Sequence, residues 1–305
     1  MKKVAIITGY TCNNNCVFCY DKEKRGIKDL NTTEIKNTLS QSRNLGCQYL
    51  DFLGGEFTIR KDASELIAFA KRLGFQVISV TTNGRIFTYK RHLQRFVDAG
   101  INSIVFSIHG HTPELHDAQT KVDGSFRQLM KGIENAKKLG FEVRTNTTIN
   151  SFNYKNLPEI AEFLIKTGTT NAEFPYFDPT GKTPEDIKTI MPQVSKASPY
   201  IQKAMDIGNK NKIKHWHVRY FPLCYLKGYE HNLSEAQSLF EQEMHFGPGF
   251  SNTQVDNSRK AINKVKSESC KKCIYDNYCE GLWKDYAKVF GTHEIKAVKN
   301  LTPGP

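Results

Sequence analysis

The sequence has no long apolar run. None of its hydrophobic stretches approaches the roughly 18 to 20 residues that a helix needs to cross a bilayer, so a membrane-spanning helix is excluded. The start, MKKVAIITGYT, has two lysines and a short apolar run, but a small-residue cleavage site does not follow it. Internal repeats, coiled-coil heptads and low-complexity tracts are also missing. We therefore expect a cytoplasmic globular protein with no membrane partner.

Cysteine, by contrast, is plentiful. The chain has eight cysteines, and thiols in the cytoplasm stay reduced, so structural disulfides are not the explanation. Cys47 stands alone between a helix and a strand, and we expect it to be a buried core thiol. The other seven fall into an N-terminal group and a C-terminal group, which are Cys12, Cys16 and Cys19, and Cys224, Cys270, Cys273 and Cys279.

Short β-branched or aliphatic runs alternate with amphipathic helical patterns up to about residue 210. Six such units in succession predict an α/β fold, with a parallel sheet and helices packed outside it. Residues from about 179 to 212 are expected to form a loop and an outer helix, 212–221 (KIKHWHVRYF) a further strand, and 245–254 (HFGPGFSNTQ) a loop. The expected strands are 4–9, 49–53, 75–82, 103–110, 143–149 and 172–177, and the expected helices include 64–74, 90–100, 125–140 and 157–168.

The unusual polar stretches all follow strands. The three N-terminal cysteines come after the first expected strand, Gly54-Gly55-Glu56 after the second, and Thr82-Asn83-Gly84 after the third. In a parallel sheet the ligand site lies at the carboxyl ends of the strands. The sequence therefore predicts one composite site at that edge.

The stretch CNNNCVFC, followed by GGE after the second strand, resembles the radical S-adenosylmethionine (radical SAM) superfamily. The family pattern is CxxxCxΦC with an aromatic Φ, which is Phe18 here. The resemblance implies a partial (β/α)6 TIM-like barrel. It also implies that Cys12, Cys16 and Cys19 hold a 4Fe-4S cluster whose fourth iron is open to S-adenosylmethionine (SAM). One-electron reduction then cleaves SAM to a 5'-deoxyadenosyl radical, which abstracts a substrate hydrogen.

The resemblance also implies contacts to SAM. Gly54, Gly55 and Glu56 would bind the methionine ammonium with backbone groups and a carboxylate. Glycine is needed there because a Cβ would block so close an approach. Phe18 would lie near the adenine. Ribose and carboxylate contacts are expected at strand ends three, four and five. Taken alone, the TTNGR stretch is equally a turn, and three close cysteines could belong to a zinc site. The residues expected at those strand ends are Asn83, Ser107 and Asn146.

The C-terminal cysteines resemble the auxiliary-cluster extension called SPASM, or its shorter form, twitch. The run is Cys270-x2-Cys273-x5-Cys279, and Trp283 stands where a full SPASM domain has its next cysteine. Together with Cys224, four thiolates would saturate one 4Fe-4S cluster, which implies an electron-transfer or structural role. A zinc ribbon is the alternative. We accordingly expect a radical SAM core over residues 1–210 and a small Cys-rich auxiliary-cluster lobe over 211–305.

The substrate and the residue that quenches its radical are not determined by these motifs. The resemblance favours a peptide or protein side chain, as in maturases; the alternative is a dehydrogenase, epimerase or rearrangement enzyme acting on a sugar, nucleotide or similar metabolite. An electron donor such as flavodoxin or ferredoxin is implied. The net charge of +12 would also suit a metal-containing RNA-binding protein. Aromatic residues are not interleaved with a basic stripe, so nucleic acid is not expected as a partner.

Overall fold

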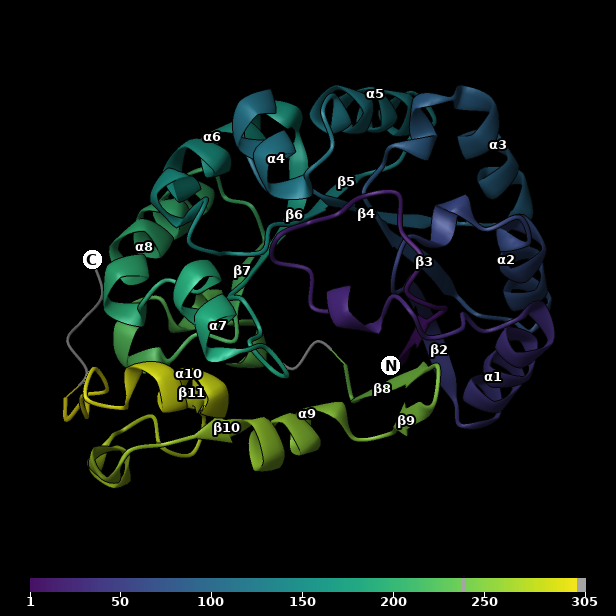
Figure 1. Ribbon diagram of the computed structural model, residues 1–305. Coiled ribbons are helices and arrows are strands. Elements are labelled where there is room, and N and C mark those ends of the chain that lie inside the picture. The colour runs from purple at the N-terminus through teal and green to yellow at the C-terminus, as the bar shows by residue number, and fades with distance from the viewer. Residues whose placement is uncertain (237–239, 301–305) are drawn as a thin grey trace. The chain divides into compact units, whose positions relative to one another are not determined.

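The computed structural model describes residues 1–236 and 240–300 (Figure 1). They pack as two compact units. The first contains Met1–Ile108, Thr112–Thr145 and Phe240–Asp256, and the second contains His109–His111 with the described residues of 146–236 and 257–300. The predicted boundary between residues 210 and 211 separates the two expected cluster-binding parts of the chain, and it does not coincide with the division into packed units. It stays a prediction.

The sheet of the first unit confirms the α/β class. Its strands run in the order β5-β4-β3-β2-β1-β8-β9, and the pairs from β1 to β4 are parallel, as alternation with helices requires. The strands are β1 (Lys2–Ile7), β2 (Cys47–Leu53), β3 (Val77–Thr82), β4 (Ser103–Ser107), β5 (Val143–Asn146), β8 (Gln242–Gly247) and β9 (Phe250–Asn252).

The pair β8 and β9 corrects one expectation, because 245–254 was predicted to be a loop. β8 lies parallel to β1 and turns back into antiparallel β9, close to the N-terminus in Figure 1. Met244 and Phe246 are buried, and the ammonium of Lys3 on β1 lies 3.0 Å from the carboxylate of Glu243. The sequence did not predict this strand, because a buried glutamate is not typical of a strand. Its partner, Lys3, lies far away along the chain.

Among the helices of the first unit, α2, α3 and α5 begin and end close to the predicted residues. Figure 1 shows α1, α2 and α3 side by side along the strands, and α1 starts with a capping box between Asn31 and Glu34. Cys47 is fully buried, as expected. The helices are α1 (Thr32–Asn44), α2 (Ala63–Arg72), α3 (Lys90–Ala99), α4 (Pro113–Thr120) and α5 (Ser125–Lys138).

In the second unit, β6 (Thr169–Pro175) and β7 (His215–Arg219) pair in parallel. Two helices, not one, fill the segment between them: Met191 is extended because it precedes Pro192, and proline disfavours a helical residue before it. The further elements are α6 (Leu157–Thr167), α7 (Pro184–Ile190), α8 (Val194–Lys210), β10 (Lys264–Val265), β11 (Leu282–Trp283) and α10 (Lys284–Phe290), with α9 (Val255–Ser258) between the units. Every helix within residues 1–236 and 240–300 is too short or too polar to span a membrane.

Candidate functional site

The three N-terminal thiols lie together on the loop that follows β1. All three are half-buried, and burial together with the neighbouring Cys19 and Cys12 raises the pKa of Cys16 to about 12. Burial also raises the pKa of Cys12, again with a contribution from Cys19. Cys12 and Cys16 therefore keep their protons at neutral pH unless a metal displaces them. A clustered, polarizable thiol set of this kind fits an iron–sulfur cluster.

Helix α4 holds one side of the cysteine loop. The backbone N–H of Asn15 donates to the carbonyl of Thr120, and that of Val17 to the carbonyl of Gln119, each at 2.9 Å. Both carbonyls belong to the last turn of α4, where no partner exists within the helix. The end of this helix therefore fixes the backbone between Cys12 and Cys19.

Two guanidinium groups hold the other side. Arg25 donates to the carbonyl of Asn14 at 2.8 Å and to the side chain of Asn15 at 3.1 Å. Arg85 donates to the carbonyl of Asn13 and to the side chain of Asn14 at 2.9 Å. The two arginines thus bind the three asparagines of CNNNC. Sequence reasoning missed both, although Arg85 ends the TTNGR stretch.

The glycines of GGE are required by the chain's own packing. A Cβ on Gly55 would lie 2.2 Å from the carbonyl oxygen of Thr11, and one on Gly54 would lie 2.3 Å from the side chain of Ile7. Both glycines also have positive φ, +52° and +79°, which other residues adopt rarely. The loop after β2 therefore lies directly on the loop after β1, and the N–H of Glu56 donates to Thr11 at 2.8 Å.

The carboxylate of Glu56 is buried, with 3% of the residue exposed. One oxygen accepts from the hydroxyls of Thr58 at 2.6 Å and Thr82 at 2.7 Å, and the other accepts from the N–H of Asn83 at 2.7 Å. Burial raises the pKa of this carboxyl, and these hydrogen bonds oppose the shift. The side chain therefore joins the ends of β2 and β3.

Asn83 lies beside the cysteine loop. Its amide nitrogen donates to Asn13 at 2.6 Å and lies 4.0 Å from the sulfur of Cys12. Of the other predicted SAM contacts, Phe18 is buried in the same loop and Ser107 ends β4. Asn146 ends β5 but belongs to the second compact unit.

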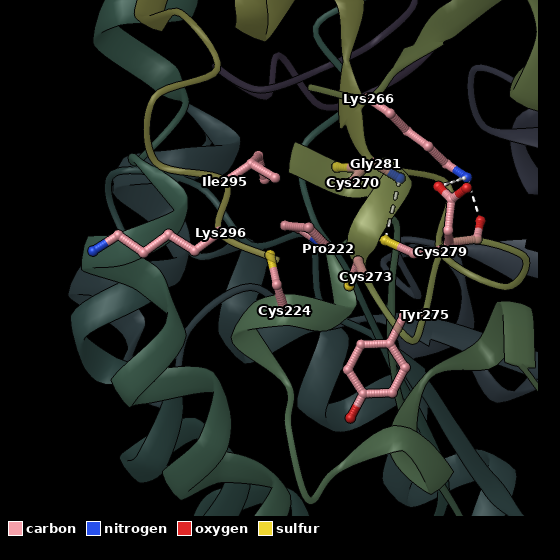
Figure 2. Close-up of a pocket in the computed structure, with 11 residues that line it drawn as sticks. Pro222, Cys224, Lys266, Cys270, Cys273, Tyr275, Cys279, Gly281, Ile295 and Lys296 are labelled. Atoms are coloured by element: carbon pink, nitrogen blue, oxygen red, sulfur yellow. Dashed lines mark hydrogen bonds and ion pairs between the residues drawn. The ribbon is translucent and has the colours of Figure 1, made fainter. Parts of the chain in front are cut away.

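The four C-terminal thiols line one hollow in the second unit (Figure 2). The empty space within it is about 310 Å³, including the part open to solvent. Cys224 comes from a short turn after β7, and the other three from the segment between β10 and β11. In Figure 2 the side chain of Lys296 extends away from the sulfurs, and the ammonium of Lys266 lies 3.0 Å from the carboxylate of Asp276. The four cysteines thus line the same hollow, and their role as ligands of a metal group stays a prediction.

Each of these sulfurs has a hydrogen-bond partner. Cys279 accepts from the N–H of Leu223 at 3.4 Å and of Gly281 at 3.3 Å, and Cys273 accepts from the N–H of Val298 at 3.3 Å. The hydroxyl of Ser267 lies 3.5 Å from Cys270, and the backbone of Lys296 bonds to Cys224. Hydrogen bonds to sulfur stabilise thiolates and tune bound iron–sulfur clusters, so this shell fits such a group. The sequence carried no signal for the part played by residues 296–298.

Charged side chains lie close to the thiols of the hollow. Burial, together with Cys279, raises the pKa of Cys224 to about 12. Arg259 binds Glu280, next to Cys279, with two hydrogen bonds of 2.8 and 2.7 Å. Trp283, at the place of a further SPASM cysteine, is buried, and the ammonium of Lys264 lies 3.8 Å from its ring centroid. Trp283 is therefore a packing residue of this unit.

Comparison with known proteins adds the following. The family model of the radical SAM superfamily matches residues 6–164. An AdoMet-dependent heme synthase of Methanosarcina barkeri is 28% identical over 176 residues, 57% of this chain and 50% of its own. A probable GTP 3',8-cyclase of Sulfolobus acidocaldarius is 27% identical over 183 residues, 59% of this chain and 58% of its own. The chain spans about half the length of the curated relatives it matches.

A solved structure resembles nearly the whole chain. Streptococcus suis SuiB bound to S-adenosylmethionine has a TM-score of 0.64 at 15% identity, over 97% of this chain and 76% of that one. SuiB bound to the precursor peptide SuiA has a TM-score of 0.65 at the same identity, over 97% and 74%. At this identity the likeness concerns the fold.

Proposed function

Because this chain belongs to the radical SAM superfamily, we propose that it is an enzyme that reductively cleaves SAM and abstracts a hydrogen from its substrate. Membership implies a 4Fe-4S cluster and SAM. The observation that carries the proposal is the convergence of Cys12, Cys16 and Cys19 on a loop whose backbone is held on both sides. When bound, the reduced cluster supplies the electron that cleaves the sulfonium C–S bond and releases the 5'-deoxyadenosyl radical.

The chain's own residues have distinct parts in this proposal. Cys12, Cys16 and Cys19 bind three irons and leave the fourth open. Gly54 and Gly55 bring the backbone of the second loop onto the first, so that SAM meets main-chain groups near Glu56. Four residues stay predictions as contacts to the adenine, ribose and carboxylate of SAM, namely Phe18, Asn83, Ser107 and Asn146.

We assign a second 4Fe-4S cluster to Cys224, Cys270, Cys273 and Cys279. The four thiols line one shared hollow, and four thiolates are the ligand number of a 4Fe-4S cluster bound entirely by protein. With every iron bound by protein, this cluster passes electrons or supports the fold rather than holding substrate. The free state of all eight thiols fits the reducing cytoplasm, where we place the enzyme.

For the substrate we propose a peptide or protein side chain. The support is the fold similarity to SuiB, a protein solved with its precursor peptide. A small metabolite is the second candidate, because relatives by sequence are named a heme synthase and a probable GTP 3',8-cyclase. The two candidates are distinguished with an extract of cells grown in deuterated water. Dialysis separates the extract into macromolecules and metabolites, and each fraction is incubated with the enzyme. Deuterium in 5'-deoxyadenosine is expected with the macromolecular fraction, and deuterium only with the metabolites would contradict the peptide proposal.

Iron analysis tests the cofactor assignments. Anaerobically reconstituted wild type is expected to hold about eight irons. Alanine at Cys12, Cys16 and Cys19 should leave about four irons and abolish 5'-deoxyadenosine formation from SAM and dithionite. Alanine at the four C-terminal cysteines should also leave about four irons. Cys47→Ala is the matched control, since this buried thiol lies in neither group and its loss should change neither value.

Two results would redirect the assignments. About four irons in wild type and none in the N-terminal variant, with zinc present, would make the C-terminal site a zinc ribbon. Cleavage of SAM that survives the loss of Cys12, Cys16 and Cys19 would reject the proposed active site.

A further inference from the structure

The segment that carries three of the C-terminal thiols is strongly basic. Residues 257–300 contain ten Lys and Arg and five Asp and Glu, whereas the whole chain has 43 and 31. Lys271 and Lys272 lie between Cys270 and Cys273, and both are exposed. Among the interactions of the described residues, Lys271 pairs with Glu268 alone, at 2.7 Å. Both side chains are exposed, so solvent weakens this ion pair. The segment that carries three of the thiols therefore has an excess of positive charge.

Large apolar side chains are exposed in the same segment. Tyr278, which precedes Cys279, is 69% exposed, and Ile274, which follows Cys273, is 38% exposed. Each of these side chains is adjacent in sequence to a thiol and presents apolar surface to solvent. We call Lys271, Lys272, Ile274 and Tyr278 the tail patch.

We propose that the tail patch docks a small acidic electron-carrier protein, which exchanges one electron with the C-terminal cluster. This inference rests on the proposed assignment of a cluster to that site. In the transfer the reduced carrier, bearing a flavin or an iron–sulfur group, loses one electron and the C-terminal cluster gains it. No bond is formed or broken, and the docked carrier then dissociates.

The chemistry of the patch fits a transient redox complex. Such interfaces are small, and opposite charge on the two partners speeds their encounter without needing a large buried area. Tyrosine at the centre of an interface supplies apolar contact at low entropic cost, with charged groups around it. An acidic surface complements the two lysines, and a basic protein or a nonpolar peptide would not.

The test isolates the C-terminal cluster. In full-length protein with alanine at Cys12, Cys16 and Cys19, only that cluster holds iron, and its reduction is followed by stopped-flow absorbance. The reductants are a reduced, acidic flavodoxin and photoreduced deazaflavin, a small neutral molecule. In this background Lys271→Glu/Lys272→Glu is compared with Lys90→Glu/Arg91→Glu, an adjacent basic pair exposed at the start of α3 in the first unit. Both double variants change the net charge equally.

Reduction by flavodoxin is expected to slow by about tenfold in the Lys271/Lys272 variant at low salt. The difference should shrink towards 1 M salt, where the Debye length falls to about 3 Å. Reduction by deazaflavin, and both reductions of the Lys90/Arg91 variant, should stay unchanged. Tyr278→Ser should slow the reduction of the cluster by flavodoxin at all salt concentrations, because this substitution removes an uncharged contact.

Each other result overturns the inference in a recognisable way. Equal slowing in the two charge-reversal variants would mean that net charge, not the patch, steers the carrier. Full flavodoxin rates in both the lysine and the Tyr278 variants, with about four irons present, would reject docking but keep the cluster. No iron in the starting variant would reject the cluster assignment itself.

Discussion

The backbone N–H of Asn83 donates a 2.7 Å hydrogen bond to the carboxylate of Glu56. Glu56 follows β2 and Asn83 follows β3, so this contact joins two loops that both touch the cysteine loop. Because the carboxylate also accepts from Thr58 and Thr82, Glu56 has a structural task besides any contact with SAM.

Replacing Glu56 by Gln should test that task. A glutamine has a single acceptor oxygen, so the backbone N–H of either Thr58 or Asn83 loses its partner in a buried place. We expect a loss of about 1–3 kcal/mol in the free energy of unfolding and weaker SAM binding, measured by anaerobic denaturation and equilibrium dialysis. Glu34→Gln is the control, because this exposed capping-box residue tolerates Gln. Equal losses in both variants would contradict the network.

Gly55→Ala is expected to destabilise the protein by more than its backbone conformation alone predicts. The new Cβ would meet the oxygen of Thr11 at 2.2 Å, and φ is +52°. Gly140→Ala is the matched control, with φ +84° and no atom within 4 Å of the new Cβ. The control should lose about 1 kcal/mol and Gly55→Ala about 2 kcal/mol more, by urea denaturation. A similar loss at both positions would show that the two loops do not touch as described.

Arg25→Gln should weaken the N-terminal cluster. It removes charge-assisted hydrogen bonds to Asn14 and Asn15, typically worth about 1.5–3 kcal/mol. It also removes a positive charge that lowers the pKa of Cys12 and Cys16. We expect lower iron retention and a more negative midpoint potential by EPR-monitored titration, whereas Arg25→Lys should keep the potential and lose iron. An unchanged potential in Arg25→Gln would place this charge too far from the cluster to act.

Acidification should destabilise the first unit through His116. Burial lowers the pKa of this imidazole to about 4 from 6.5. Between these values the unfolded chain binds a proton that the folded chain does not, so stability falls as pH decreases through 6.5. The loss from pH 7 to 5.5 should be about 1 kcal/mol for this group. His116→Phe should lose correspondingly less over the same range in denaturant titrations; an identical pH dependence would show that His116 is not buried as neutral imidazole.

Much of the first unit was predictable because its signals are local. A run of β-branched residues followed by an amphipathic helix ending in glycine marks each βα unit, as in 77–82 and 90–100. Parallel pairing then places the ends of successive strands at one edge, so motifs after strands one, two and three were expected to meet. Both cysteine groups were also predictable, because the spacing of cysteines along the chain is a local signal.

Other features depend on contacts between distant residues. β8 pairs with β1 at the other end of the chain, where Glu243 meets Lys3, and nothing near residue 243 indicates that partner. Arg25 and Arg85 resemble other surface arginines until folding brings their guanidinium groups to the carbonyls of Asn14 and Asn13. The sequence by itself determined the order of the elements and the thiols available for clusters, because periodicity and spacing are local. Only the tertiary structure decided which groups far apart along the chain hold those thiols, as the N–H of Leu223 does for Cys279 and that of Val298 for Cys273.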